Sequence, residues 1–199
     1  MPPLPGPAIA IRPLAYVGRL DARPLEAVRR IVLHCTELPD LAMARTWGER
    51  IVHGSGTGNS GHYYVDRDGR IECWVPPERV AHHVRGHNAD TIGIELVNDG
   101  RWPDWYHSRR QQPTQAYPPA QIAALVGLLD WLRRRLPALQ GLAGHEDLDT
   151  TIVAASDVPS LAVRRKIDPG PLFPWPEVLA ASGLHRLAPP SPDDPPALP

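Results

Sequence analysis

Two short apolar runs constrain the fold of this 199-residue chain more than any other feature. Residues 29–36 read Arg-Arg-Ile-Val-Leu-His-Cys-Thr, and residues 90–97 read Asp-Thr-Ile-Gly-Ile-Glu-Leu-Val. Continuous runs that are rich in β-branched residues and bounded by polar ones are typical of strands buried on both faces. Such strands indicate an α/β fold, which places its functional groups at strand ends. His34 lies at the C-terminal end of the first run.

The other elements fit a single α/β domain, which suits a chain of this length. Leucines at helical spacing predict a core helix over residues 120–136. We expect shorter helices over residues 40–53, where Asp40 is the expected cap, and at residues 173–179. Residues 62–75 read as two short strands around an Arg-Asp-Gly turn, which is a strong hairpin signal.

Three stretches lie outside this pattern. We expect residues 1–27 to be an irregular lead-in, residues 147–163 an inserted loop and residues 183–199 a Pro-rich tail. Many of the 25 prolines lie near the two ends of the chain, where they disfavour helices and central strands. The main folded domain would then occupy residues 28–182.

Charge and targeting signals narrow the possible partners. The net charge of −1 argues against a nucleic-acid-binding face and against a polybasic membrane patch. Residues 1–10 carry neither a basic nor a long apolar segment, and no run is long enough to span a bilayer. We therefore expect a cytoplasmic protein, or one exported by a route without a cleaved signal. Cys35 and Cys73 do not make a disulfide framework.

Lys166 is the only lysine of the chain and lies two positions before Asp168 (168 − 166 = 2), ahead of a Pro-Gly-Pro turn. In an extended segment these two side chains point to the same side. A metal held by Asp168 with a cation beside it is one interpretation. A local ion pair ahead of a turn is the other.

His34, His145 and Asp168 each follow or end an apolar element, and two His with one Asp suit zinc. His34 alone can equally be a core or strand-cap histidine. Glu95 stands in a strand that should be mostly buried, where a carboxylate either has a raised pKa or finds a partner. It is therefore a candidate general acid or base, with an arginine salt bridge as the alternative.

Two further segments are candidates for a substrate groove. Residues 81–87 are rich in histidine and read as a polar loop at the rim of a site. Residues 101–117 mix aromatic side chains, among them Trp105, with arginines such as Arg109. They can line a groove for sugar or peptide, or pack over the core.

Five motifs occur in an order that resembles a known family. They are Ile31-Val32-Leu33-His34, Ser60-Gly61-His62-Tyr63, Thr91-Ile92-Gly93-Ile94-Glu95-Leu96, Gly144-His145-Glu146-Asp147 and Lys166-Ile167-Asp168-Pro169-Gly170-Pro171. Together they resemble the zinc-dependent N-acetylmuramoyl-L-alanine amidases of the amidase-2 family. That family includes cytosolic muropeptide-recycling amidases, phage T7 lysozyme and the peptidoglycan recognition proteins.

The resemblance implies a mixed central β-sheet flanked by helices, with zinc in a surface groove. By position, the zinc ligands would be His34, His145 and Asp168. Lys166 would stabilise the transition state, and Glu95 would be the catalytic acid and base. Substrate contacts would include His62 and His83, at positions where the recycling branch also carries histidine.

The implied reaction is hydrolysis of the amide between N-acetylmuramic acid and the L-Ala of the stem peptide, with zinc-bound water as the nucleophile. The implied partner is peptidoglycan or a muropeptide, and we expect a monomer. The alternative is a non-catalytic peptidoglycan-binding or sensing module, as in family members that have lost a ligand. The long segment between His145 and Asp168 (168 − 145 = 23) and the large 101–117 loop leave open whether the substrate is a soluble anhydro-muropeptide or the polymeric wall.

Overall fold

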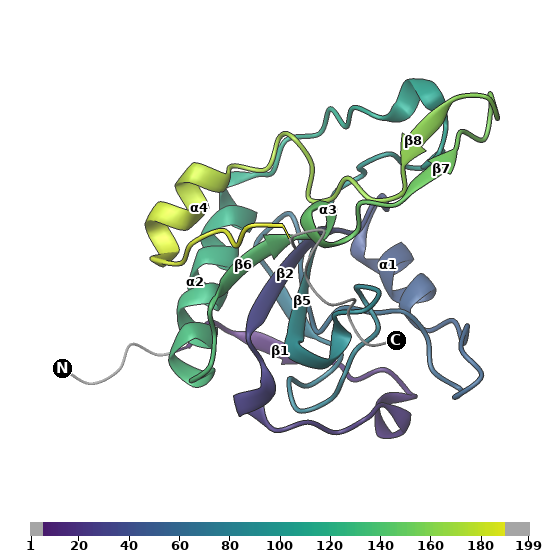
Figure 1. Ribbon diagram of the computed structural model, residues 1–199. Helices are drawn as coiled ribbons and strands as arrows, with labels where there is room; N and C mark the ends of the chain where they lie inside the picture. The colour runs from purple at the N-terminus through teal and green to yellow at the C-terminus, as the bar shows by residue number, and fades with distance from the viewer. Residues whose placement is uncertain (1–5, 190–199) are drawn as a thin grey trace.

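The computed structural model describes residues 6–189, which form one mixed six-stranded sheet with helices on both sides (Figure 1). The strand order is β1-β4-β3-β5-β2-β6. Only β3 and β4 pair antiparallel within this sheet, and its other neighbours run parallel. The strands are β1 (Ile9–Ile11), β2 (Arg30–Cys35), β3 (Tyr63–Val65), β4 (Ile71–Cys73), β5 (Thr91–Leu96) and β6 (Gly141–Gly144). The predicted α/β fold with a mixed central sheet is confirmed.

Helices α2 (Pro119–Arg135) and α4 (Trp175–Ser182) lie on one side of the sheet, and α1 (Leu41–Gly48) lies on the other (Figure 1). Asp40 caps α1 as expected, because its Oδ1 accepts a hydrogen bond from the amide of Met43 at 2.7 Å. The helix ends at Gly48, earlier than the predicted His53. The short α3 (His145–Leu148) follows β6 directly.

The sheet separates two apolar cores, and strand alternation decides which side chains enter each one. Ile31 and Leu33 of β2 pack with the leucines of α2, as do Ile92 and Ile94 of β5. Side chains at the intervening positions therefore face the side of α1. His34 is one of these, and it is paired in register with Glu95 of β5. The alternation of side chains along β2 and β5 thus places the candidate site on the α1 side of the sheet.

The expectation of an irregular stretch over residues 1–27 was wrong for residues 9–11. Ile9–Ile11 form β1, which pairs in parallel with β4 at the edge of the sheet. Short 3₁₀ turns follow at Val17–Arg19 and Leu25–Ala27. A strand of three residues is too short to show an alternating pattern in the sequence. Residues 1–5 lie outside the described part of the chain.

Residues 147–163 were also expected to be a loop, but they contain most of a two-stranded antiparallel hairpin. It consists of β7 (Ile152–Ala154) and β8 (Ala162–Arg164), and it projects from the body of the domain (Figure 1). The two ends of this segment are tied together. The amide of Glu146 donates to the carbonyl of Asp168 at 2.9 Å, and the amide of Arg165 donates to the carbonyl of Thr151 at 2.8 Å.

The start of the predicted C-terminal tail is part of the fold. The amide of Leu187 donates to the carbonyl of Leu142 at 2.7 Å, beside β6. Arg186 forms ion pairs with Glu146 and Asp147 at 3.0 and 2.7 Å. Residues 190–199, where the Pro-rich end was predicted, lie outside the described residues. Within the described part, no helix is both long and apolar enough to cross a membrane.

Candidate metal centre and active site

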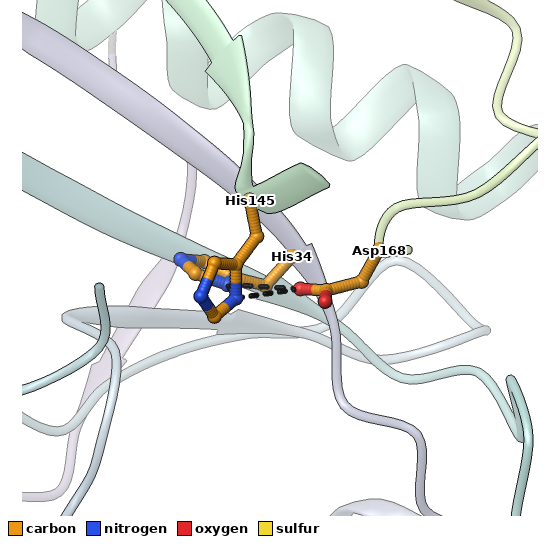
Figure 2. Close-up of side chains that lie close together, drawn as sticks. All are labelled: His34, His145 and Asp168. Carbon is orange, nitrogen blue, oxygen red and sulfur yellow. Dashed lines mark hydrogen bonds and ion pairs between the residues drawn. The ribbon is translucent and has the colours of Figure 1, made fainter. Parts of the chain in front are cut away.

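Three side chains meet at the C-terminal edge of the parallel strands (Figure 2). His34 lies near the end of β2, and His145 follows the neighbouring strand β6. Their Nδ1 atoms are 2.9 Å apart, and each lies 3.1 Å from Oδ2 of Asp168. Asp168 lies in the segment that follows β8. His34 lies 111 and 134 positions from the other two residues, yet all three present their donor atoms to one point.

The donor set fits a metal ion. All three side chains are buried, with exposures of 2–3%, and their ligand atoms lie within 4.8 Å of one another. Oδ1 of Asp168 and Nε2 of His145 are buried without a hydrogen-bond partner. Burial lowers the pKa of His34 to about 4, so this imidazole is neutral near pH 7, the form that binds metals.

Asp168 is held as a carboxylate. Burial alone would raise its pKa, but the interactions with His145, Lys166 and His34 keep its pKa well below the usual range. Within residues 6–189, Asp168 is in direct contact with His34 and His145, each at 3.1 Å, and it forms no ion pair with Lys166. A local Lys–Asp pair ahead of a turn therefore does not describe this segment.

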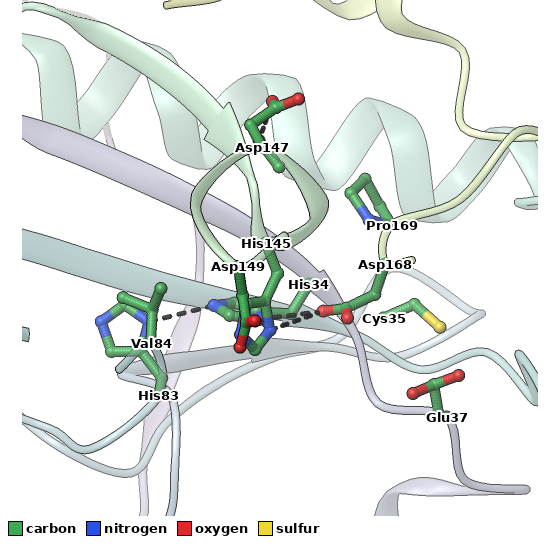
Figure 3. A network of polar contacts seen from close by, with 12 residues as sticks. His34, Cys35, Glu37, His83, Val84, His145, Asp147, Asp149, Asp168 and Pro169 are labelled. Atoms are coloured by element: carbon green, nitrogen blue, oxygen red, sulfur yellow. Dashed lines mark hydrogen bonds and ion pairs between the residues drawn. The ribbon is translucent and has the colours of Figure 1, made fainter. Parts of the chain in front are cut away.

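His34 also begins a chain of hydrogen bonds in which the donor and the acceptor of each bond can be assigned (Figure 3). Nε2 of His34 lies 3.0 Å from Nδ1 of His83, and Nε2 of His83 lies 3.1 Å from Oγ1 of Thr91. The Thr91 hydroxyl donates to the carbonyl of His87 at 2.6 Å, so its oxygen accepts from His83. Nδ1 of His83 then accepts from His34. This leaves Nδ1 of His34 unprotonated and directed at the donor cluster.

Glu95 and Lys166 lie beside this cluster. Glu95 stands opposite His34 in the β2–β5 register. Burial, assisted by the charge of Asp168 and opposed by that of Lys166, raises the pKa of Glu95 to about 8. Burial acts to lower the pKa of Lys166, but Asp168 and other nearby carboxylates raise it overall, so this ammonium stays charged. The pair supplies a carboxyl group that can exchange a proton near pH 8 and a fixed cation.

Two glycines of the predicted motifs make room for these groups. A Cβ on Gly61 would lie 2.7 Å from Cγ of Glu95, and a Cβ on Gly93 would lie 2.6 Å from Nδ1 of His83. Both contacts are closer than side chains tolerate, so a larger residue at either position would displace a group of the site. The glycines of these two motifs therefore have a packing role.

A cleft of about 950 Å³ contains the five central side chains His34, Glu95, His145, Lys166 and Asp168. His83 and Trp105 also line it. His62 does not line it. Its side chain is 0% exposed, and its Nδ1 accepts from the amide of Gly93 at 3.0 Å, so the structure places it in a buried contact with β5. Arg109 is exposed on a 3₁₀ turn and lies outside the cleft lining.

Other lining residues were not named among the predicted site residues, although Tyr106 and Arg85 belong to the two segments expected to line a groove. Trp47 of α1 and Tyr106 contribute partly exposed aromatic rings, and Arg85 and Arg165 contribute charge. Glu37, which follows β2, also belongs to the lining. A tryptophan in a helix and arginines in loops have no sequence pattern that separates them from ordinary surface residues. Only the fold identifies them.

Comparisons with known proteins agree on one family. Residues 24–171 match the Amidase_2 family, described as N-acetylmuramoyl-L-alanine amidase. The N-acetylmuramoyl-L-alanine amidase AmiD of Escherichia coli K12 is 34% identical over 140 residues, which is 63% of this chain and 45% of AmiD. The endolysin of Enterobacteria phage K11 is 29% identical over 111 residues, which is 56% of this chain and 65% of the endolysin. The chain thus spans about half to two thirds of the length of these curated relatives.

Solved structures give the same result. AmiD from E. coli in complex with the substrate anhydro-N-acetylmuramic acid-L-Ala-D-gamma-Glu-L-Lys has a TM-score of 0.59 and 27% identity, and the match covers 82% of this chain and 59% of that one. AmpDh3 from Pseudomonas aeruginosa in complex with anhydromuramic pentapeptide has a TM-score of 0.62 and 26% identity, with coverage of 82% and 62%. Since the family match spans most of the chain and includes the whole donor cluster, the protein belongs to the Amidase_2 family of N-acetylmuramoyl-L-alanine amidases.

Proposed function

We propose that this protein hydrolyses the amide bond between N-acetylmuramic acid and the L-Ala of the peptidoglycan stem peptide. The observation that carries this proposal is the convergence of a His/His/Asp donor set with Glu95 and Lys166 in one cleft. Two relatives of the same fold are solved with muramic acid peptides bound, which supports this class of substrate.

Zinc is the metal that we propose for this site. Its tetrahedral bonds of about 2.0–2.1 Å place neighbouring donors roughly 3.3 Å apart. The donor separations of 2.9–3.1 Å are close to this value. His34, His145 and Asp168 would hold the ion and leave one position open. When bound, the ion would supply a Lewis acid for the scissile carbonyl and would lower the pKa of a bound water toward about 7.

The side chains of this protein would carry the proton transfers. Glu95 takes a proton from the attacking water, whose oxygen forms the new bond to the carbonyl carbon. When the C–N bond breaks, the same carboxyl group gives that proton to the L-Ala nitrogen, which leaves as an amine. Lys166 lies beside Glu95 as a fixed cation and stabilises the negative charge that develops on the carbonyl oxygen.

The experiment that tests this function combines metal analysis with product analysis. We expect about one zinc per chain in the purified protein. Intact sacculi and anhydro-muropeptides are digested side by side, and mass spectrometry should detect peptides that begin with L-Ala. Absence of both metal and product would contradict the proposal. Retention on sacculi without cleavage would instead support a peptidoglycan-binding module.

Removal of the His83 ring should weaken zinc binding. His83 accepts a hydrogen bond from His34 and so fixes the tautomer of that ligand. Loss of a hydrogen bond to a metal-ligating histidine lowers metal affinity by about 10–100-fold. Competition with a chromophoric chelator measures the dissociation constant of His83→Ala. The neighbouring His82→Ala is the control, because His82 lines the cleft without contacting His34. Equal affinities for the two variants would contradict this role.

Three properties of the protein stay predictions: a monomeric state, a cytoplasmic location with export as the alternative, and the choice between soluble and polymeric substrate. The side-by-side digestion described above decides the last of these directly.

A further inference from the structure

Arg101 is an almost completely buried arginine next to the candidate active site. Its side chain and that of Glu37 are 1% and 6% exposed. Nε of Arg101 donates to Oε1 of Glu37 at 2.6 Å, and Nη2 donates to Oε2 at 3.0 Å. This bidentate pair joins the loop after β5 to the segment after β2, the strand that carries His34. A buried arginine of this kind needs partners for all its donors.

The remaining donors of Arg101 reach the segment that carries Lys166. Nη1 donates to the carbonyl of Arg164 at 2.9 Å and to Oε1 of Gln111 at 3.1 Å, and Nη2 also donates to the carbonyl of Arg165 at 3.0 Å. A guanidinium group has five N–H donors. All five are therefore used, and two of them hold the carbonyls directly before Lys166.

The surrounding backbone is shaped for this contact. Gly100 has a φ of +52°, and a Cβ there would lie 2.7 Å from Cγ of Glu37 and 3.0 Å from Sγ of Cys35. On the other side, Nε1 of Trp105 donates to the carbonyl of Glu37 at 3.1 Å. The large 101–117 loop is thus anchored against the end of β2 at its first residues.

We propose that Arg101 is a positioning residue, which fixes the Lys166 ammonium relative to the metal ligands. It does so by clamping the Arg164 and Arg165 carbonyls against Glu37, which lies in the segment directly after the strand that carries His34. The effect of Arg101 on the reaction rate rests on the proposed amidase function. The position of Lys166 is testable without catalysis.

The spectroscopic test uses Lys166 as the only lysine of the chain. Zinc-loaded protein labelled with ¹³C at the lysine ε position gives one signal, which reports the surroundings of Lys166. We expect Arg101→Gln to shift or broaden this signal. Arg67→Gln is the matched control, because Arg67 also joins a carboxylate and a backbone carbonyl but contacts Asp99 and Pro39 instead. Wild-type spectra for both variants would overturn the inference.

The kinetic test separates positioning from general stability. A displacement of about 1 Å at a reacting centre can cost about 10²-fold in rate. We expect Arg101→Gln to lower kcat by about 10–100-fold while KM and zinc affinity stay within about threefold. In Lys166→Met protein, the same change should have little further effect, because both act through one group. Additive losses in the double variant would overturn the inference.

Glu37→Gln keeps the shape of the pair and serves as the second variant if Arg101→Gln does not fold. It should shift the Lys166 signal and lower kcat in the same direction, and wild-type behaviour of Glu37→Gln would overturn the inference. An inactive wild-type protein would contradict the proposed function, whereas the lysine spectrum would still decide the role of Arg101.

Discussion

Glu95→Gln protein is expected to cleave the muramoyl–L-Ala amide with a kcat/KM about 10²–10⁴-fold below that of the wild type, the range of a lost general acid–base. The amide of glutamine has the same shape but can neither take the proton of the attacking water nor return it to the leaving amine. Zinc should stay bound, because Glu95 is not among the three donor side chains. Steady-state kinetics on a defined muropeptide, with metal analysis of the same sample, measure both quantities.

Two controls separate this loss from a folding defect. Glu72→Gln changes another buried carboxylate, which accepts from Nε1 of Trp74 at 2.8 Å and lies outside the cleft lining. It should keep wild-type activity.

The second control is the stability of the variant. Burial raises the folded-state pKa of Glu95 to about 8, from an ordinary value of 4.5. Between these pH values the folded state holds the proton more tightly, so the contribution of Glu95 to stability falls as pH rises.

Metal-free Glu95→Gln should therefore be at least as stable as metal-free wild type near pH 8, since glutamine has no charge to bury. Urea unfolding measures this. Wild-type kinetics in Glu95→Gln would exclude Glu95 as the acid–base group. A fall in both zinc content and stability would show that the carboxyl group has a structural role instead.

Lys166→Met is expected to lower kcat by about 10²–10³-fold, which corresponds to about 2.7–4 kcal/mol of transition-state stabilisation. Methionine is similar in length but has no charge to offer the developing oxyanion. The ammonium lies among Asp168, Glu37 and Glu95, whose charges favour its protonated form. The cation is therefore present across the working pH range.

KM should change much less than kcat in Lys166→Met, because the interaction strengthens only as charge develops on the carbonyl oxygen. Lys166→Arg tests whether charge alone is sufficient. It should recover only part of the rate, because a planar guanidinium does not replace a compact ammonium at a point contact. Equal losses in kcat and zinc content would assign Lys166 to the metal site instead.

The sequence predicted the central strands and the side chains at their ends. Their apolar runs are continuous, and β-strand alternation then fixes which residues share a face. His34 and Glu95 could be placed in this way. The donor set could not be derived from spacing, because His145 and Asp168 lie on other segments. Their grouping depended on motifs that resemble a family, and the geometry now brings all three together.

The features that the sequence did not predict are those that depend on distant partners. β1 and β7–β8 consist of three-residue strands, which form because a neighbouring strand is available. His62 was expected at the substrate and is instead a buried brace of β5. Arg101 and Glu37 are 64 positions apart, and nothing local to either residue indicates the other.

The tie between Glu146 and Asp168 has a consequence for how this family can diversify. The hydrogen bond between their backbones closes the intervening hairpin into a side branch that leaves and rejoins the domain next to the metal ligands. Because the amide of Arg165 also donates to the carbonyl of Thr151, the part of the hairpin between these two residues can lengthen or shorten while His145, Lys166 and Asp168 keep their places. The tip of the hairpin is therefore a natural grafting point, where new sequence can be added without moving the candidate metal ligands.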